Sequence, residues 1–129
     1  MKLGYIIIYV KDLKATVAFY KKAFGIKCKF IHPKNDYAEM ETGATSLAFA
    51  SEVLAKQNGI KIRPNRIAQT SAGVEIAFAT KDVTKAFKKA ITAGGKTVLK
   101  PTKKPWGQTV AYVKDNNGFL VEICSPVAV

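Results

Sequence analysis

Residues 6–13 read Ile-Ile-Ile-Tyr-Val-Lys-Asp-Leu, and residues 76–83 read Ile-Ala-Phe-Ala-Thr-Lys-Asp-Val. Each stretch is an apolar run that ends in Lys-Asp before an aliphatic residue, a pattern typical of a strand that leads into a helix. Asp12 and Asp82 suit the N-cap position, because a short carboxylate accepts hydrogen bonds from the unpaired N–H groups of a first helical turn. The recurrence of this signal predicts an internal repeat.

Helical spacing follows both aspartates. Leu13, Val17, Tyr20 and Phe24 share one helix face before Gly25, and a similar face in residues 83–91 ends at Gly94-Gly95. A glycine after a helix suits the left-handed cap conformation. Strands separated by turn residues are then expected at 26–31, 36–41 and 45–50 in the first copy, and at 97–99, 108–113 and 119–124 in the second. A loop is expected at 101–106.

The sequence therefore predicts an α+β protein with one domain over residues 1–129, built from two βαβββ modules. Module one spans 1–51, a polar linker or lid spans 52–71, and module two spans 72–129. One helix covers one face of each sheet, so the opposite faces are expected to curve together as a cleft-like mixed sheet.

Bulk properties exclude several classes of protein. No apolar run approaches the roughly 18 residues of a membrane span, no small-residue cleavage site follows the N-terminal strand, and Cys28 and Cys124 form no CxxC pair. We expect a cytoplasmic protein without a membrane partner. The net charge is +12, but only two of the 21 basic residues are arginine. Scattered lysines favour a solvated surface over specific nucleic-acid binding, although nonspecific polyanion binding and steering of an anionic small molecule remain alternatives.

Two stretches carry a resemblance to a known family. The first is Tyr9-Val10-Lys11-Asp12-Leu13 leading to Ala18-Phe19-Tyr20 and Phe24-Gly25, and the second runs from Pro105-Trp106-Gly107-Gln108 to Asp115-Asn116-Asn117-Gly118-Phe119-Leu120-Val121-Glu122. The chain resembles the vicinal oxygen chelate superfamily, which holds glyoxalase I, extradiol dioxygenases, and fosfomycin- and bleomycin-resistance proteins. The resemblance implies paired βαβββ modules, eight strands around a cavity, and a homodimer that completes the sites.

The resemblance also implies where metal ligands would lie. The corresponding positions hold Tyr5, Ala48, Glu75 and Glu122, of which only Glu122 matches the expected residue type. Alanine cannot ligate, and a phenol with a pKa of about 10 is a weak ligand for divalent ions. His32 lies outside these positions. We therefore predict no metal and no other cofactor, with a weak hard-ion site at Glu75 and Glu122 as the alternative.

Strand alternation indicates what would line the cavity. Tyr5, Ile7 and Tyr9 share one strand face, and Glu122 stands as the only charged residue in an apolar strand. Glu122 is the candidate catalytic residue, as a ligand anchor or general base, or else a carboxylate hydrogen-bonded to Tyr5 or to backbone. Trp106 forms either a wall at the cavity mouth or a packing plug. The residues predicted to bind ligand are Tyr5, Ile7, Tyr9, Ala48, Glu75, Trp106 and Glu122.

Tyr37, Glu39 and Glu41 alternate along the third strand, where we expect the two acids to lie on a solvated face. The resulting hypothesis is metal-independent binding of a small, aromatic molecule in an apolar cavity with a few polar groups. The alternative is a lyase, isomerase or dioxygenase of the same superfamily with a degenerate metal site or metal-free acid–base chemistry.

Overall fold

Each half of the chain folds as a β-α-β-β-β unit in the computed structural model, which describes residues 1–127. The elements of the first half are β1 (Tyr5–Val10), α1 (Leu13–Phe24), β2 (Cys28–Ile31), β3 (Tyr37–Met40) and β4 (Ser46–Ser51). A short helix, α2 (Glu52–Gln57), follows. The elements of the second half are β5 (Glu75–Ala79), α3 (Val83–Thr92), β6 (Lys96–Lys103), β7 (Thr109–Lys114) and β8 (Leu120–Cys124).

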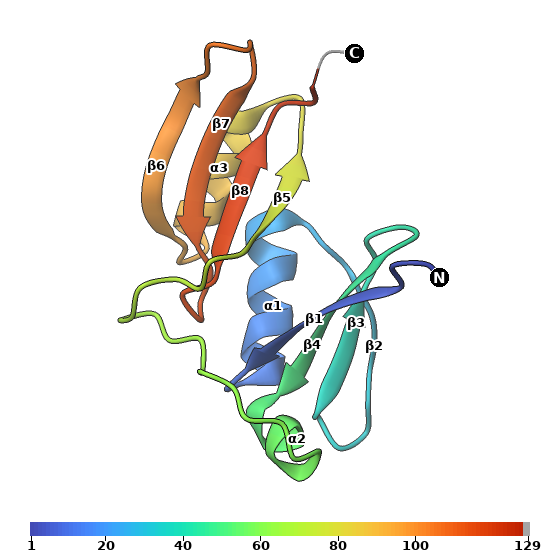
Figure 1. Cartoon of the computed structure of the whole chain (residues 1–129). Helices are drawn as coiled ribbons and strands as arrows, with labels where there is room; N and C mark the ends of the chain where they lie inside the picture. Colours follow the sequence, from blue (N-terminus) through green and yellow to red (C-terminus); the bar gives the residue numbers. More distant parts are fainter. Residues whose placement is uncertain (128–129) are drawn as a thin grey trace.

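The strands form two four-stranded sheets with the same topology, in the orders β1-β4-β3-β2 and β5-β8-β7-β6 (Figure 1). β1 pairs with β4 in parallel, and β5 pairs with β8 in parallel; all other neighbouring strands are antiparallel. Ile7 lies opposite Ala48 in the first sheet, as Ala77 lies opposite Glu122 in the second. This register confirms that Ala48 and Glu122 occupy equivalent positions in the two modules.

α1 and α3 begin after the predicted N-cap residues, α1 ends at the predicted Gly25, and α3 ends at Thr92, with Ala93 as its C-cap just before Gly94. The Asp12 carboxylate accepts the Ala15 N–H at 3.0 Å, and the Asp82 carboxylate accepts the Lys85 N–H at 3.0 Å. Gly25 ends α1 with a φ of 68°, a left-handed conformation that side-chain-bearing residues rarely adopt. The repeated Lys-Asp signal thus fixes both strand-to-helix transitions.

One expectation for the connections is wrong, and another gains detail. The segment expected to be a linker or lid, residues 52–71, begins with a helix that the sequence patterns did not predict, α2; its N-cap is Ser51, whose hydroxyl accepts the Leu54 N–H at 3.1 Å. The loop expected from Pro101 is the end of β6, which continues to Lys103. A proline is tolerated there because β6 is one of the two edge strands of its sheet, and the pairing with β7 is irregular between Leu99 and Thr102.

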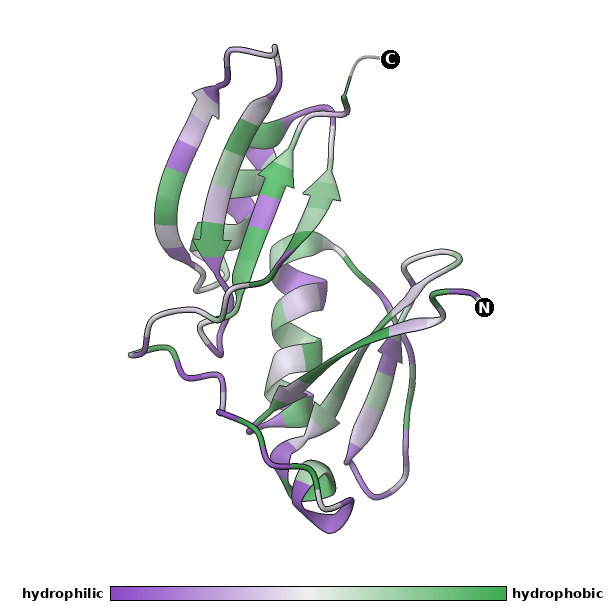
Figure 2. Cartoon of the chain, in the orientation of Figure 1, coloured by the Kyte–Doolittle hydropathy of each residue, from purple (hydrophilic) through white to green (hydrophobic). Residues whose placement is uncertain are grey.

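Each sheet is covered on one face by its own helix, and α1 contacts α3, so the modules meet through their helices (Figure 1). Most strands are largely hydrophobic, whereas β6 carries several hydrophilic bands (Figure 2). The buried apolar residues, mostly from the strands and from α1 and α3, form the core. The rings of Phe24 and Phe78 pack across the modules with centroids 5.2 Å apart. No helix among residues 1–127 combines the length and apolarity needed to cross a bilayer.

A buried polar network also joins the modules. The Tyr20 hydroxyl on α1 donates to Asp115 Oδ2 at 2.7 Å, and both side chains are fully buried. Asp115 Oδ1 accepts the backbone N–H groups of Asn117 and Phe119 at 2.8 and 2.9 Å. Asn117 in turn donates to Thr16 Oγ1 at 2.9 Å. Burial raises the pKa of the Asp115 carboxyl, against the lowering effect of these hydrogen bonds.

Candidate functional site

The face of the second sheet that α3 leaves uncovered carries a carboxylate–tyrosine pair. Glu122 is the only charged residue of β8. Figure 2 shows this strand as hydrophobic except for one hydrophilic band. Tyr112 lies directly opposite it on β7, and the Tyr112 hydroxyl donates to Glu122 Oε1 at 2.9 Å. Glu75 and Cys124 complete this set, on β5 and at the end of β8.

These groups perturb one another's protonation. The hydrogen bond to the Glu122 carboxylate, together with burial, raises the pKa of Tyr112 to about 12. Burial and then the negative charge of Glu122 raise the pKa of Glu75. Burial, followed by the Glu122 carboxylate, also raises the pKa of the Cys124 thiol. The set therefore combines an acceptor, Glu122, with neighbours that retain their protons more readily than usual, an arrangement suited to hydrogen bonding or proton transfer.

The uncovered face of the first sheet is aromatic. Tyr5, Ile7 and Tyr9 lie on it from β1, as predicted, and Ala48 lies beside Ile7 on β4. Ala48 is fully buried among its neighbours, while Tyr5 and Ile7 are exposed. Ala48 therefore offers neither a polar group nor accessible surface at the position that Glu122 occupies in the second sheet, so the structure does not support it as a ligand contact.

A second carboxylate–tyrosine pair lies on this face. The Tyr37 hydroxyl donates to Glu39 Oε2 at 2.9 Å, and Phe30 packs beside Tyr37 with ring centroids 6.1 Å apart. Glu39 is only 9% exposed, so the expectation of a solvated side chain is wrong for it; Glu41 is exposed, as expected. Burial and the hydrogen bond to Glu39 raise the pKa of Tyr37 to about 12.

Sequence reasoning missed Tyr112 altogether, although a signal for it existed. The turn at 115–118 sets the register of the β7–β8 hairpin, and counting outward from it places Tyr112 opposite Glu122. Glu122 was expected to pair with Tyr5 or with backbone. Its partner is instead this residue of the neighbouring strand.

Trp106 lies at the tip of the β6–β7 hairpin. Its side chain is 66% exposed, and its indole N–H donates to the Gln108 side chain at 2.7 Å. This exposure argues against a packing plug. A role for Trp106 against a ligand stays a prediction.

The residues at the positions implied for a metal do not fit one. Ala48 has no donor atom, and one oxygen of Glu122 accepts the Tyr112 hydroxyl. Within residues 1–127, no three His, Cys, Asp or Glu side chains come together in a way that could hold a metal ion. His32 lies at the β2–β3 turn and contacts Asp36, with 3.1 Å between Nδ1 and Oδ1.

The two uncovered faces belong to different sheets. Within residues 1–127, no hydrogen bond or ion pair links the Tyr37–Glu39 pair on the first sheet to the Tyr112–Glu122 pair on the second. The first strand of each sheet, β1 or β5, is an edge strand. A groove of about 430 Å³ lies between these edges and is lined by Ile6 of one and Ala77 of the other. Both edges and both faces are thus accessible in a single chain.

Three comparisons place this arrangement among known proteins. The chain is 29% identical over 125 residues to "Uncharacterized protein YraH" of Bacillus subtilis (strain 168), covering 95% of this chain and 97% of the relative. A glyoxalase-related enzyme from Fulvimarina pelagi superposes with a TM-score of 0.83 at 22% identity, covering 98% of this chain and 88% of that one. A glyoxalase/bleomycin resistance protein/dioxygenase family enzyme from Burkholderia phytofirmans PsJN gives 0.82 at 21% identity, covering 99% and 100%.

The two superpositions establish the fold. A family model extends the match to sequence level, because it aligns with residues 2–123. On that match, the chain belongs to the Glyoxalase/Bleomycin resistance protein/Dioxygenase superfamily.

Proposed function

We propose that this protein binds a small molecule without a metal, on the uncovered sheet faces, with Glu122 as the polar anchor. The observation that carries this proposal is the Tyr112–Glu122 pair, with 2.9 Å between its oxygens, which joins β7 to the otherwise apolar strand β8. A few fixed polar groups on an apolar and aromatic surface are what orient a small ligand. Tyr5, Ile7 and Tyr9 would supply apolar and aromatic contact, which favours a ligand with an aromatic ring.

The proposal includes a homodimer, because each face is open on its own. The exposed edge strand β1 presents Tyr5, Ile6 and Ile7 at 56%, 41% and 44% exposure. An apolar strand with unpaired backbone groups is a template for pairing with another strand. Pairing of β1 with β5 of a second copy would continue one sheet into the other and join the aromatic face to the face that bears Glu122. We place this dimer in the cytoplasm, consistent with the two free cysteines.

A screen of aromatic metabolites and antibiotics by thermal shift tests the binding function. Compounds that stabilise the wild type are expected to bind Glu122→Gln at least about tenfold more weakly, because a hydrogen bond to a charged group contributes about 1.5–3 kcal/mol. Glu41→Gln is the matched control, since Glu41 is exposed at the end of β3, and it should retain the wild-type affinity.

Two results would contradict this reading of the site. One is equal affinity of the wild type and Glu122→Gln for every stabilising compound. The other is a stoichiometric divalent ion in protein purified without chelator or nickel resin, with affinity for the compounds lost after its removal.

The dimer is tested by a single charge placed on the edge strand. Ile6→Lys is expected to convert a dimer to a monomer in sedimentation equilibrium, because a lysine on an edge strand opposes strand pairing. Val53→Lys, on the exposed surface of α2, should remain dimeric. A wild type that is monomeric at about 100 µM, far above the micromolar range where specific complexes form, would refute the dimer.

An enzymatic role is the second candidate, favoured by the raised pKa of Glu75 beside Glu122. Neighbouring carboxyl groups with different proton affinities are a common acid–base arrangement. A lyase, isomerase or dioxygenase reaction is therefore the alternative for this site. Conversion of a bound compound by the wild type, abolished in Glu122→Gln, would decide in its favour.

A further inference from the structure

The only two arginines of this lysine-rich chain lie on the same cavity. The sequence has 21 basic residues, and Arg63 and Arg66 are both in the segment that follows α2. This segment folds against Gly118 of the β7–β8 turn and encloses a cavity of about 240 Å³. Its lining includes Arg63, Asn65, Arg66, Gln69, Thr70 and Gly118.

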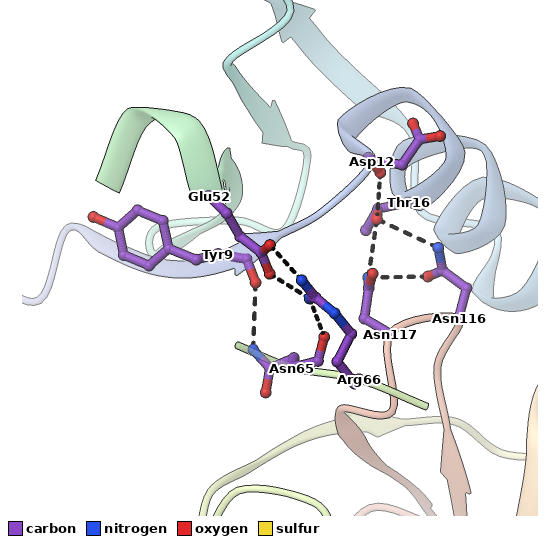
Figure 3. Close-up of polar contacts among 8 residues, drawn as sticks. All are labelled: Tyr9, Asp12, Thr16, Glu52, Asn65, Arg66, Asn116 and Asn117. Carbon is purple, nitrogen blue, oxygen red and sulfur yellow. Dashed lines mark hydrogen bonds and ion pairs between the residues drawn. The ribbon is translucent and has the colours of Figure 1, made fainter. Parts of the chain in front are cut away.

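Arg66 has a structural role in building this cavity (Figure 3). Its guanidinium donates to both carboxylate oxygens of Glu52, at 2.6 and 2.8 Å, and to the Asn65 carbonyl at 2.9 Å. The Asn65 side chain donates to the Tyr9 carbonyl at 3.3 Å, which ties the segment to β1. The hydrogen bond from Arg66, offset in part by burial, lowers the pKa of Glu52, so the carboxylate stays charged and the arginine stays paired.

The other wall of the cavity is equally fixed. The Ser71 hydroxyl donates to the Gly118 carbonyl at 2.7 Å, and a Cβ on Gly118 would lie 2.4 Å from the Arg66 carbonyl oxygen. Lys114 Nζ donates to the Gln69 carbonyl at 3.1 Å, which brings a second cation to the rim. The cavity therefore exists only because glycine permits this close approach.

Arg63 is the group that these contacts leave available. Within residues 1–127, no hydrogen bond or ion pair engages its guanidinium, and Glu52, the carboxylate bonded to this segment, is neutralised by Arg66. Arg63 thus lines the cavity without a compensating acid, and the Lys114 ammonium group lies next to it, bonded to the carbonyl of the lining residue Gln69. Gln69 and Thr70 add an amide and a hydroxyl as further donors.

We propose that this cavity binds a phosphate group, with Arg63 as the principal ligand. A guanidinium forms two parallel hydrogen bonds to phosphate, which a lysine cannot do. A phosphate monoester carries about −1.5 to −2 charge near pH 7, which the two cations match. The volume of about 240 Å³ lies below the usual range for ligand pockets, about 300–1,000 Å³, which favours a small group such as a phosphate. The net charge of +12 raises the encounter rate with anions.

The test is a titration with inorganic phosphate followed by the backbone amide signals in nitrogen-15 NMR, with sodium chloride at equal ionic strength as the reference. Saturable shifts are expected for residues 63–72 and for Gly118. Arg63→Gln should weaken binding at least about tenfold, since a charge-assisted hydrogen bond contributes about 1.5–3 kcal/mol. Arg63→Lys keeps the charge but loses the planar guanidinium, so its phosphate affinity should lie between those of the wild type and Arg63→Gln.

Lys61→Gln is the control for diffuse attraction to a basic protein, because it removes one charge from the same exposed segment but not from the cavity lining. It should change the affinity by less than about twofold. Equal weakening by Lys61→Gln and Arg63→Gln, or shifts that never saturate and spread over the lysines, would overturn the proposal. Arg63 is exposed, so both variants are expected to fold, and unchanged spectra outside the cavity verify this.

Discussion

Replacing Asp115 by alanine is expected to lower the free energy of unfolding by about 3–5 kcal/mol. The substitution leaves the Tyr20 hydroxyl and the backbone N–H groups of Asn117 and Phe119 without their acceptor. Each buried donor without a partner costs about 1–3 kcal/mol. A domain of this size has only about 5–15 kcal/mol in total, so the variant should unfold at a much lower urea concentration.

Asp82→Ala is the matched control, because it removes a carboxylate that bonds one exposed N–H, that of Lys85. Loss of such a helix cap costs about 1 kcal/mol. Tyr20→Phe should fall between these two, since it removes one of the three bonds and leaves Asp115 Oδ2 unpaired. Similar urea midpoints for Asp115→Ala and Asp82→Ala would show that the buried network contributes little.

Gly118→Ala is expected to cost about 2–5 kcal/mol and to loosen the segment that carries both arginines. The φ of Gly118 is +84°, a conformation that costs an L-residue about 1–2 kcal/mol. The added Cβ would also lie 2.4 Å from the Arg66 carbonyl oxygen. Relieving this overlap should lower the free energy of unfolding by a further amount of about 1–3 kcal/mol. Urea unfolding measures the loss, and hydrogen exchange should show faster exchange at residues 66–71.

Gly107→Ala separates strain from collision. Gly107 also has a positive φ, of 98°, but nothing lies within 4 Å of an added Cβ. This variant should lose only the conformational term, about 1–2 kcal/mol, and leave exchange at residues 66–71 unchanged. Equal losses in the two glycine variants would mean that the segment moves aside at no cost.

Most of the fold could be predicted from local signals. The two Lys-Asp transitions, the helix-ending Gly25 and the alternation of β1 are properties of neighbouring residues, and each is confirmed. What failed depends on position in the sheet: Pro101 is compatible with β6 only because that strand lies at an edge, and sequence alone does not show which strands are edges. The α2 helix was missed because its one capping signal, Ser51, lies in a polar segment that resembles a loop.

The candidate site was predicted less completely, because its key contacts join strands. Alternation placed Tyr5, Ile7 and Tyr9 on the correct face, and the repeat placed Glu122 opposite the position of Ala48. The hydrogen bonds of Tyr112 to Glu122 and of Tyr37 to Glu39 were not predicted, because they depend on strand register and on burial. The contacts between the modules join residues that are far apart in the sequence; Tyr20 and Asp115, for example, are separated by 95 positions. No local sequence pattern indicates such contacts.

The buried network has a further consequence for the repeat itself. The position of α3 that corresponds to Tyr20 in α1 is Ala90, so the network exists in one direction only. Asp115 of module two accepts a hydrogen bond from Tyr20 of module one. Ala90 of module two has no hydroxyl, so it cannot make the reciprocal bond to module one. The halves are therefore no longer interchangeable, and we expect the two modules to unfold in a single cooperative transition.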